Sequence, residues 1–274
     1  MYKVFQEEQE IVDKEIIQAG ILAVRRGGAV LRDNFGKAHR IAYKGKLDLV
    51  TDIDHLSEET IVGFLTREFP QFGILAEERT EVAATAPSRW ILDPLDGTTN
   101  YAHGYPFFCV SLALEQKNRV IWGAVYDPMR DELFTAELGN GAYLNEKQIQ
   151  VSETERLDRA LLCTGFPYDV HDSADNNLDH FPRFIKTAQA IRRDGAAALD
   201  LCYVGAGRFD GFWEMKLKPW DMAAGCLVVT EAGGRVTAFD GMPLDLITRG
   251  DVLAANKLLH NDMMHILTQS KSHA

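Results

Sequence analysis

Residues 90–99 read WILDPLDGTT, an apolar strand that runs directly into two aspartates, a glycine and two threonines. An aspartate at the end of a buried strand is costly unless it is paired or bound to a metal. Asp93 and Asp96 also repel each other, and the pKa of clustered carboxyl groups rises unless a cation neutralises them. The segment therefore predicts a cation site at the end of a sheet strand.

A second pair of carboxylates, Glu77 and Glu78, follows another predicted strand at residues 72–76. Neither pair has an evident role in building a fold. Ligand sets made only of oxygen select hard cations, so Mg²⁺ is favoured here over Zn²⁺. The carboxylates together predict a magnesium site.

Gly97, Thr98 and Thr99 add the second half of a phosphate site. Gly97 lets the backbone approach a ligand closely, and the free N–H groups of a helical turn that starts there can hold phosphate oxygens. A threonine hydroxyl at this place can orient a water molecule. The alternative is an ordinary Asp-Gly surface turn with a threonine cap. The apolar residues 90–92 in front of the segment favour the functional interpretation.

Asp221 precedes the small residues of the segment 222–225 and follows Lys218, Pro219 and Trp220. It is a natural N-cap for the helix expected at 222–231. An aspartate before a buried helix of small residues can also face inward as a ligand. Sequence physics leaves the two interpretations open.

The rest of the chain predicts helices and strands in layers. The first helix is expected to run from about residue 11 to residues 34–36. The second is expected from Asp54, as its N-cap, to Phe69, where Pro70 stops it. A strand-rich first half followed by an alternating second half indicates layered α and β structure in two lobes. The other expected strands are 89–92, 107–115, 119–126, 133–136, 142–144, 160–164, 211–214 and 252–255, and the other helices are 181–190, 196–205 and 258–269.

The composition is that of a globular protein of 274 residues, with 46% hydrophobic and 25% charged residues. The formal net charge of −11 argues against binding to nucleic acid or anionic membranes. An anionic substrate remains compatible, because a bound cation can invert the local sign of the charge. The cysteines have no CxxC spacing and are expected to be reduced core thiols. No secretory signal or membrane-spanning run is visible, so a cytoplasmic enzyme is the default expectation.

These motifs resemble the inositol monophosphatase family, part of a Mg²⁺-dependent, lithium-sensitive phosphatase superfamily that includes fructose-1,6-bisphosphatase. The family signature D-P-[LI]-D-G-T-T-N stands at residues 93–100. The second signature, W-D-x-A-A-G followed by [TR]-E-A-G-G, stands at 220–225 and 230–234, and weaker elements stand at 48–51 with Asp54 and at 76–78. The resemblance runs from about residue 10 to the C-terminus, in the order of the family.

The resemblance implies a layered αβαβα sandwich of the sugar-phosphatase type, in the α+β or α/β class. An N-terminal α+β lobe at residues 1–150 would carry most of the metal ligands. A C-terminal α/β lobe at 151–274 would complete the metal and substrate sites. The resemblance also implies a homodimer and inhibition by lithium.

The resemblance further implies the metal ligands. Glu77, Asp93 and the backbone carbonyl of Leu95 would hold one Mg²⁺, and Asp93, Asp96 and Asp221 would hold a second. Glu77 would also help to hold a weaker third ion.

Catalytic roles follow from the same resemblance. Thr98, with Glu77 and the metal, would position the attacking water. Asp93 would be the third catalytic residue. The backbone N–H groups of Gly97 and Thr98 would take the phosphate. Asp54 and Lys44 match positions at the edge of the metal site, although a helix cap and a loop charge are alternative roles for them.

The substrate hydroxyls would be bound by Glu214, Ala197 and the turn at 195–196, with a contribution from Asp221. Without the resemblance, Glu214 is equally compatible with a surface charge at a strand end. Asp194 departs from the small, apolar or hydroxylated residue that is commoner at its position in the family, which affects the substrate pocket and not the metals.

The resemblance thus implies an inositol-1(or 4)-monophosphatase that hydrolyses a small phosphorylated polyol. Fructose 1,6-bisphosphate, histidinol phosphate and adenosine 3′,5′-bisphosphate are alternative substrates. A nucleotide would require an aromatic shelf and basic residues, which the sequence does not reveal. A regulatory protein-binding role on a phosphatase fold is the alternative outside enzymology.

Overall fold

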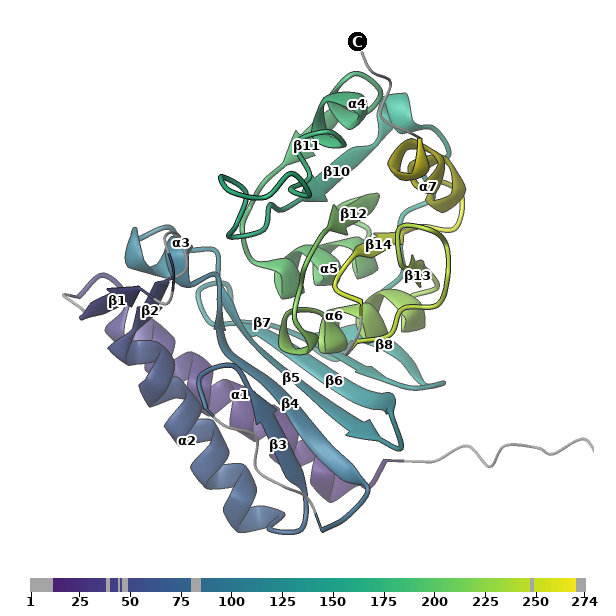
Figure 1. Ribbon diagram of the computed structural model, residues 1–274. Helices are drawn as coiled ribbons and strands as arrows, with labels where there is room; N and C mark the ends of the chain where they lie inside the picture. The colour runs from purple at the N-terminus through teal and green to yellow at the C-terminus, as the bar shows by residue number, and fades with distance from the viewer. Residues whose placement is uncertain are drawn as a thin grey trace, which may run out of the picture.

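The computed structural model describes residues 12–37, 40–43, 45, 49–79, 85–246 and 249–269. Within them, the two larger of three sheets alternate with three layers of helix, in the order α, β, α, β, α (Figure 1). This arrangement confirms the predicted layered sandwich.

The larger sheet lies in the first half of the chain. Its strands are β3 (Gly73–Ala76), β4 (Ser88–Asp96), β5 (Cys109–Gln116), β6 (Arg119–Asp127), β7 (Glu132–Glu137), β8 (Gly141–Leu144) and β9 (Lys147–Gln148), in that spatial order. Only the β3–β4 pair is parallel, and the predicted antiparallel pair is confirmed as β5 and β6. The outer face is covered by α1 (Lys14–Asn34) and α2 (Asp52–Glu68) (Figure 1). These helices bury apolar side chains in a cluster with Trp90 and Trp122.

The smaller sheet has the order β11 (Ala190–Arg192), β10 (Leu161–Thr164), β12 (Gly211–Glu214), β14 (Val252–Ala255) and β13 (Arg235–Thr237). Helices α5 (Ala197–Gly205) and α6 (Pro219–Glu231) lie between the two sheets, and α4 (Phe181–Ile185) and α7 (His260–Thr268) cover the far face. The short elements are β1 (Ile41–Tyr43), β2 (Leu49–Thr51), α3 (Thr98–Ala102) and a 3₁₀ turn at Leu157–Arg159.

Small residues let the middle helices approach both sheets and each other. A Cβ on Gly123 would lie 2.9 Å from Ala224 Cα on α6. A Cβ on Gly225 would lie 2.7 Å from Leu201 Cβ on α5. This close packing holds α6 against the large sheet, so the start of α6 stands in a fixed place beside the end of β4. All four cysteines are buried and free, as predicted.

Three predictions about secondary structure are wrong. The helix expected at 181–190 ends at Ile185, because residues 190–192 pair with β10 as an edge strand. Asp54 is not an N-cap, since Thr51 caps α2 and Asp54 occupies the third helical position of a capping box. Asp221 is not an N-cap either, because α6 begins at Pro219 and Asp221 accepts a hydrogen bond from the backbone N–H of Lys218.

Candidate active site

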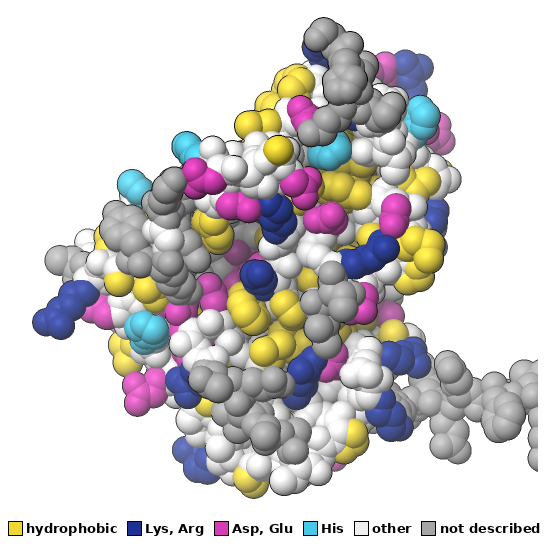
Figure 2. Space-filling model, in the orientation of Figure 1, with side chains coloured by type: hydrophobic (Ala, Val, Ile, Leu, Met, Phe, Trp, Pro, Cys, Tyr) yellow, Lys and Arg dark blue, Asp and Glu magenta, His cyan; other side chains and the backbone are white. Residues whose placement is uncertain are grey.

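A cavity of about 420 Å³ opens where the carboxyl end of β4 faces the starts of α5 and α6. Figure 2 shows the hollow between the two parts of the molecule, with acidic side chains in it. The cavity brings together residues from both halves of the chain. Nine of the predicted catalytic, metal and substrate residues line it: Glu77, Asp93, Leu95, Asp96, Gly97, Thr98, Ala197, Glu214 and Asp221.

The two exceptions are the predicted edge residues. Asp54 is fully buried behind the cavity wall and reaches the site through Thr98. Lys44 lies outside the described residues.

An irregularity in β4 places both signature aspartates at the cavity. The pairing register with β5 shifts between Asp93 and Asp96, whereas residues three apart on a regular strand point to opposite faces. The Asp93 carboxylate accepts a hydrogen bond from the Leu95 N–H at 2.9 Å. The Pro94 carbonyl, on the other side of the turn, accepts one from Ser57 at 2.9 Å. The helix layer therefore fixes the bulge that presents the aspartates.

Gly97 starts the short helix α3 with a positive φ of 95°. A Cβ at this position would lie 3.0 Å from the Phe107 carbonyl, so the close turn requires glycine. The hydroxyl of the next residue, Thr98, lies 3.0 Å from Asp54 Oδ1 and 3.0 Å from the Leu95 carbonyl. The predicted helical turn at the phosphate segment is confirmed.

Hydrogen bonds of Asp96 and Asn100 join the signature segment to the second half of the chain. The backbone N–H of Ala198, in the first turn of α5, donates to Asp96 Oδ2 at 2.7 Å. The side-chain amide of Asn100 donates to the carbonyls of Phe107 and Asp194, both at 2.7 Å. These bonds fix the turn at 193–196 against the signature segment.

The carboxylates are arranged for a cation. Burial raises the pKa of Asp93 well above its ordinary value, and repulsion from Glu77, Asp96 and Asp221 raises it further. Burial also raises the pKa of Asp96 to about 7, against the opposing hydrogen bond from Ala198. Four acidic groups and the Leu95 carbonyl at one cavity make an oxygen-only donor set, which fits a hard divalent cation.

Sequence reasoning missed the basic and aromatic part of the cavity. Arg193, Lys216 and Lys218 line it, together with Phe166, Tyr168 and Trp220. Burial raises the pKa of Glu214 to about 8, and the positive charge of Arg193 opposes this shift. The alternation of lysines at 216 and 218 directly before the second signature was the available signal, since both residues follow the strand that ends at Glu214.

The fold and this cavity define a metal-dependent phosphatase. The model of the inositol monophosphatase family matches residues 13–272. The chain belongs to this family.

Relatives agree with that assignment. The chain is 46% identical over 247 residues to an inositol-1-monophosphatase of Synechocystis, covering 89% of this chain and 86% of the relative. It is 41% identical to the Nus factor SuhB of Pseudomonas aeruginosa, covering 88% and 91%.

Among solved structures, an IMPase/NADP phosphatase complexed with Mg²⁺ and phosphate superposes with a TM-score of 0.83 at 25% identity. The superposition covers 94% of this chain and 97% of the chain of that phosphatase. In the part of the chain that the structure describes, every helix is too short or too polar to traverse a bilayer.

Proposed function

We propose that the protein hydrolyses inositol monophosphate to myo-inositol and phosphate in a Mg²⁺-dependent reaction. The observation that carries this proposal is the convergence of Glu77, Asp93, Asp96 and Asp221 on one cavity beside Gly97. The name of the relative in Synechocystis supports the substrate, and the complex with Mg²⁺ and phosphate supports the metal.

Glu77, Asp93, the Leu95 carbonyl, Asp96 and Asp221 would hold two Mg²⁺ ions, with a weaker third beside Glu77. Bound magnesium would supply an acidified water as nucleophile and charge stabilisation for the leaving alkoxide. Side chains and backbone groups of the protein would orient the water and bind the phosphate and the alcohol.

Thr98 orients the attacking water in this proposal. When its hydroxyl donates to Asp54, the oxygen keeps its lone pairs for a proton of that water. Glu77, on the same cavity wall, is the second acceptor for the water. The N–H groups of Gly97 and Thr98 face the phosphate as the free donors of a helical turn. The water attacks phosphorus, the bond to the sugar oxygen breaks, and no covalent phosphoenzyme forms.

Glu214 binds the hydroxyls of the alcohol in this proposal, with Ala197 and the turn at 195–196 beside it. A carboxylate that is buried and partly balanced by Arg193 can accept hydrogen bonds from a polyol. The basic residues at the cavity favour a second candidate within the class, a substrate with a second anionic group such as fructose 1,6-bisphosphate or adenosine 3′,5′-bisphosphate.

The similarity to a Nus factor favours a second function of another class, a regulatory role through protein contact. The intact carboxylate cluster is compatible with both roles. Inhibition by lithium and a homodimer, which the family resemblance implies, belong to the same proposal.

The decisive experiment measures kcat/KM at fixed Mg²⁺ for a panel of substrates. The panel is inositol 1-phosphate, glycerol 2-phosphate, fructose 1,6-bisphosphate, histidinol phosphate and adenosine 3′,5′-bisphosphate. Inositol 1-phosphate is expected to be the best substrate, and Asp93→Asn is expected to abolish turnover while the fold survives.

A bisphosphate as the best substrate would overturn the choice of substrate. Negligible turnover of the whole panel would favour the regulatory role, and normal turnover by Asp93→Asn would overturn the metal mechanism.

A further inference from the structure

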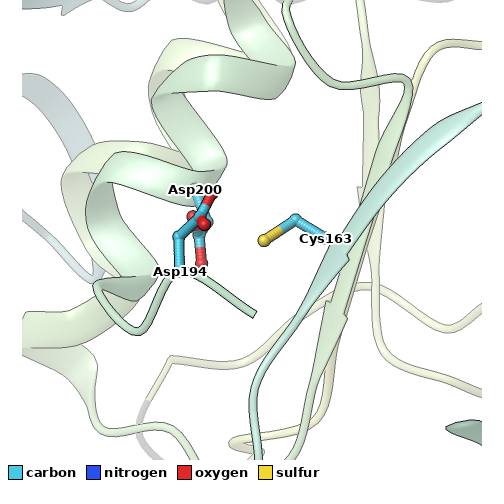
Figure 3. Close-up of side chains that lie close together, drawn as sticks. All are labelled: Cys163, Asp194 and Asp200. Atoms are coloured by element: carbon cyan, nitrogen blue, oxygen red, sulfur yellow. The ribbon is translucent and has the colours of Figure 1, made fainter. Parts of the chain in front are cut away.

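A second group of potential ligands lies behind the wall of the cavity. Cys163 on β10, Asp194 on the turn before α5, and Asp200 in α5 place one ligand atom each within 4.8 Å of one another (Figure 3). Cys163 and Asp200 are buried and Asp194 is half-buried. None of the three lines the active-site cavity.

An unpartnered oxygen points to a missing ligand in this group. Asp200 is only 1% exposed, and its Oδ1 accepts no hydrogen bond from the residues that the structure describes. A buried carboxylate oxygen without a partner is expensive. The Asp200 carboxylate has a hydrogen bond with the Cys163 thiol, so Oδ1 is the oxygen that a cation among the three groups would satisfy.

Burial disfavours the charged forms of these groups when no cation is bound. Burial and the charge of Asp200 raise the pKa of the Cys163 thiol well above its usual range, and the hydrogen bond from the backbone N–H of Asp194 opposes this shift. Burial also raises the pKa of Asp194, and the positive charges of Arg192, Arg130 and Arg193 oppose this shift. A divalent cation among the three groups would stabilise their anionic forms.

We propose that Cys163, Asp194 and Asp200 form a binding site for a thiophilic divalent cation such as Zn²⁺, separate from the magnesium cavity. A thiolate selects zinc or cobalt over magnesium, and three protein ligands leave a fourth tetrahedral position for water. Ligand atoms around tetrahedral zinc are about 3.5 Å apart.

The site would couple to the active site through the backbone. Asp194 is held by Asn100 of the signature segment, and α5 donates its Ala198 N–H to Asp96. A cation that joins Asp194 to Asp200 would therefore tie the substrate turn at 193–196 to the start of α5. Binding would also release the thiol proton, so the affinity rises with pH.

The test titrates Co²⁺ into metal-free protein in the presence of excess Mg²⁺, which occupies the oxygen-only site and competes weakly for a thiolate. We expect a sulfur-to-cobalt charge-transfer band that saturates at one equivalent and disappears when Zn²⁺ is added. Cys163→Ala should abolish the band. Cys109→Ala is the matched control, because the sulfur of Cys109 lies 3.7 Å from the active-site Asp96 and is the thiol that a metal in the active site would meet. This variant should retain the band.

Asp194→Asn provides a test that does not disturb the core. It should weaken Co²⁺ binding at least about tenfold, which is the lower range for loss of even an outer-shell partner of a metal. Absence of the band from the wild-type protein, or its survival in Cys163→Ala, would overturn the proposal. Loss of the band in Cys109→Ala would move the thiolate to the active site and overturn it equally.

Discussion

The hydroxyl of Thr98 lies 3.0 Å from Asp54 Oδ1, which links the phosphate segment to the first turn of α2. The other oxygen of Asp54 accepts the backbone N–H of Thr51 at 2.9 Å. Asp54 therefore completes a helix cap and holds the Thr98 hydroxyl with the same carboxylate. A residue that sequence patterns describe as a cap acts as the support of a residue at the active site.

Replacement of Thr98 tests whether this hydroxyl orients the water. Thr98→Val keeps the shape and removes the hydroxyl, and we expect kcat to fall by about 10²- to 10³-fold with little change in KM. Thr98→Ser, which keeps the hydroxyl, should stay within about tenfold of the wild type. Steady-state kinetics at saturating Mg²⁺ measure both. Equal losses in the two variants would contradict the role of the hydroxyl.

Asp93→Asn should stabilise the metal-free protein. Asp93 is buried among Glu77, Asp96 and Asp221, which raise its pKa by repulsion, so ionisation at neutral pH opposes folding. Removal of that charge should raise the free energy of unfolding by roughly 1–3 kcal/mol without metal. Urea denaturation in EDTA measures it.

In the presence of Mg²⁺, the wild type should be more stable than Asp93→Asn, the reverse of the order expected without metal. The wild type should gain stability on addition of Mg²⁺, as any ligand of the folded state requires, and Asp93→Asn should gain little. Asp158→Asn, on the surface, is the control and should behave like the wild type in both conditions. A metal-free Asp93→Asn that is less stable than the wild type would show that the carboxylates are not mutually repulsive.

Gly165→Ala should damage substrate binding through Glu214. A Cβ at residue 165 would overlap the Glu214 carboxylate, and this flexible group can move away at little cost to the fold. We expect KM for inositol 1-phosphate to rise on the order of tenfold, the equivalent of one good hydrogen bond. Glu214→Gln should have a similar effect.

An aryl phosphate without polyol hydroxyls separates this effect from damage to the metal site. Its KM should be the same in Gly165→Ala, Glu214→Gln and the wild type. A comparable rise of KM for both substrates would place Glu214 outside the alcohol subsite.

His260 should make stability depend on pH. It is fully buried at the start of α7, and burial, with the nearby Arg235, lowers the pKa of its imidazole to about 4. The unfolded chain, with a histidine pKa of about 6.5, binds more protons between these two values. The free energy of unfolding should therefore fall by roughly 1–3 kcal/mol as the pH drops from 7 to about 4.

His260→Gln isolates this contribution, because glutamine does not titrate. Its unfolding free energy, measured by denaturant titration at each pH, should fall less steeply over the same window. An unchanged slope would assign the acid sensitivity to other groups.

Much of the fold could be predicted because periodicity and turn residues are local signals. The antiparallel pair of β5 and β6 and the end of α6 at Gly233, which has a positive φ of 88°, follow from such signals. The edge strand β11 could not be predicted. Its three residues become a strand only by pairing with β10, a tertiary contact that no local pattern encodes.

The residues of the candidate site also fall into two groups, those that local sequence predicts and those that only tertiary packing brings to the cavity. Asp93, Asp96 and Gly97 stand in one segment whose composition is costly without a ligand, so the sequence points to them. The residues Arg193 and Lys216 reach the cavity only through the packing of the small sheet against the large one. The grouping of Cys163 with Asp200 likewise depends on the contact between β10 and α5, which sequence separation conceals.

The hydrogen bond from Ala198 to Asp96 spans 102 positions of the chain. While the protein is being synthesised, the signature aspartates leave the ribosome long before α5 and Asp221 exist. A nascent chain that has folded only its large sheet has no closed cavity and no complete ligand set. The complete ligand set therefore forms only after residue 221 has been synthesised and α6 has packed against the large sheet.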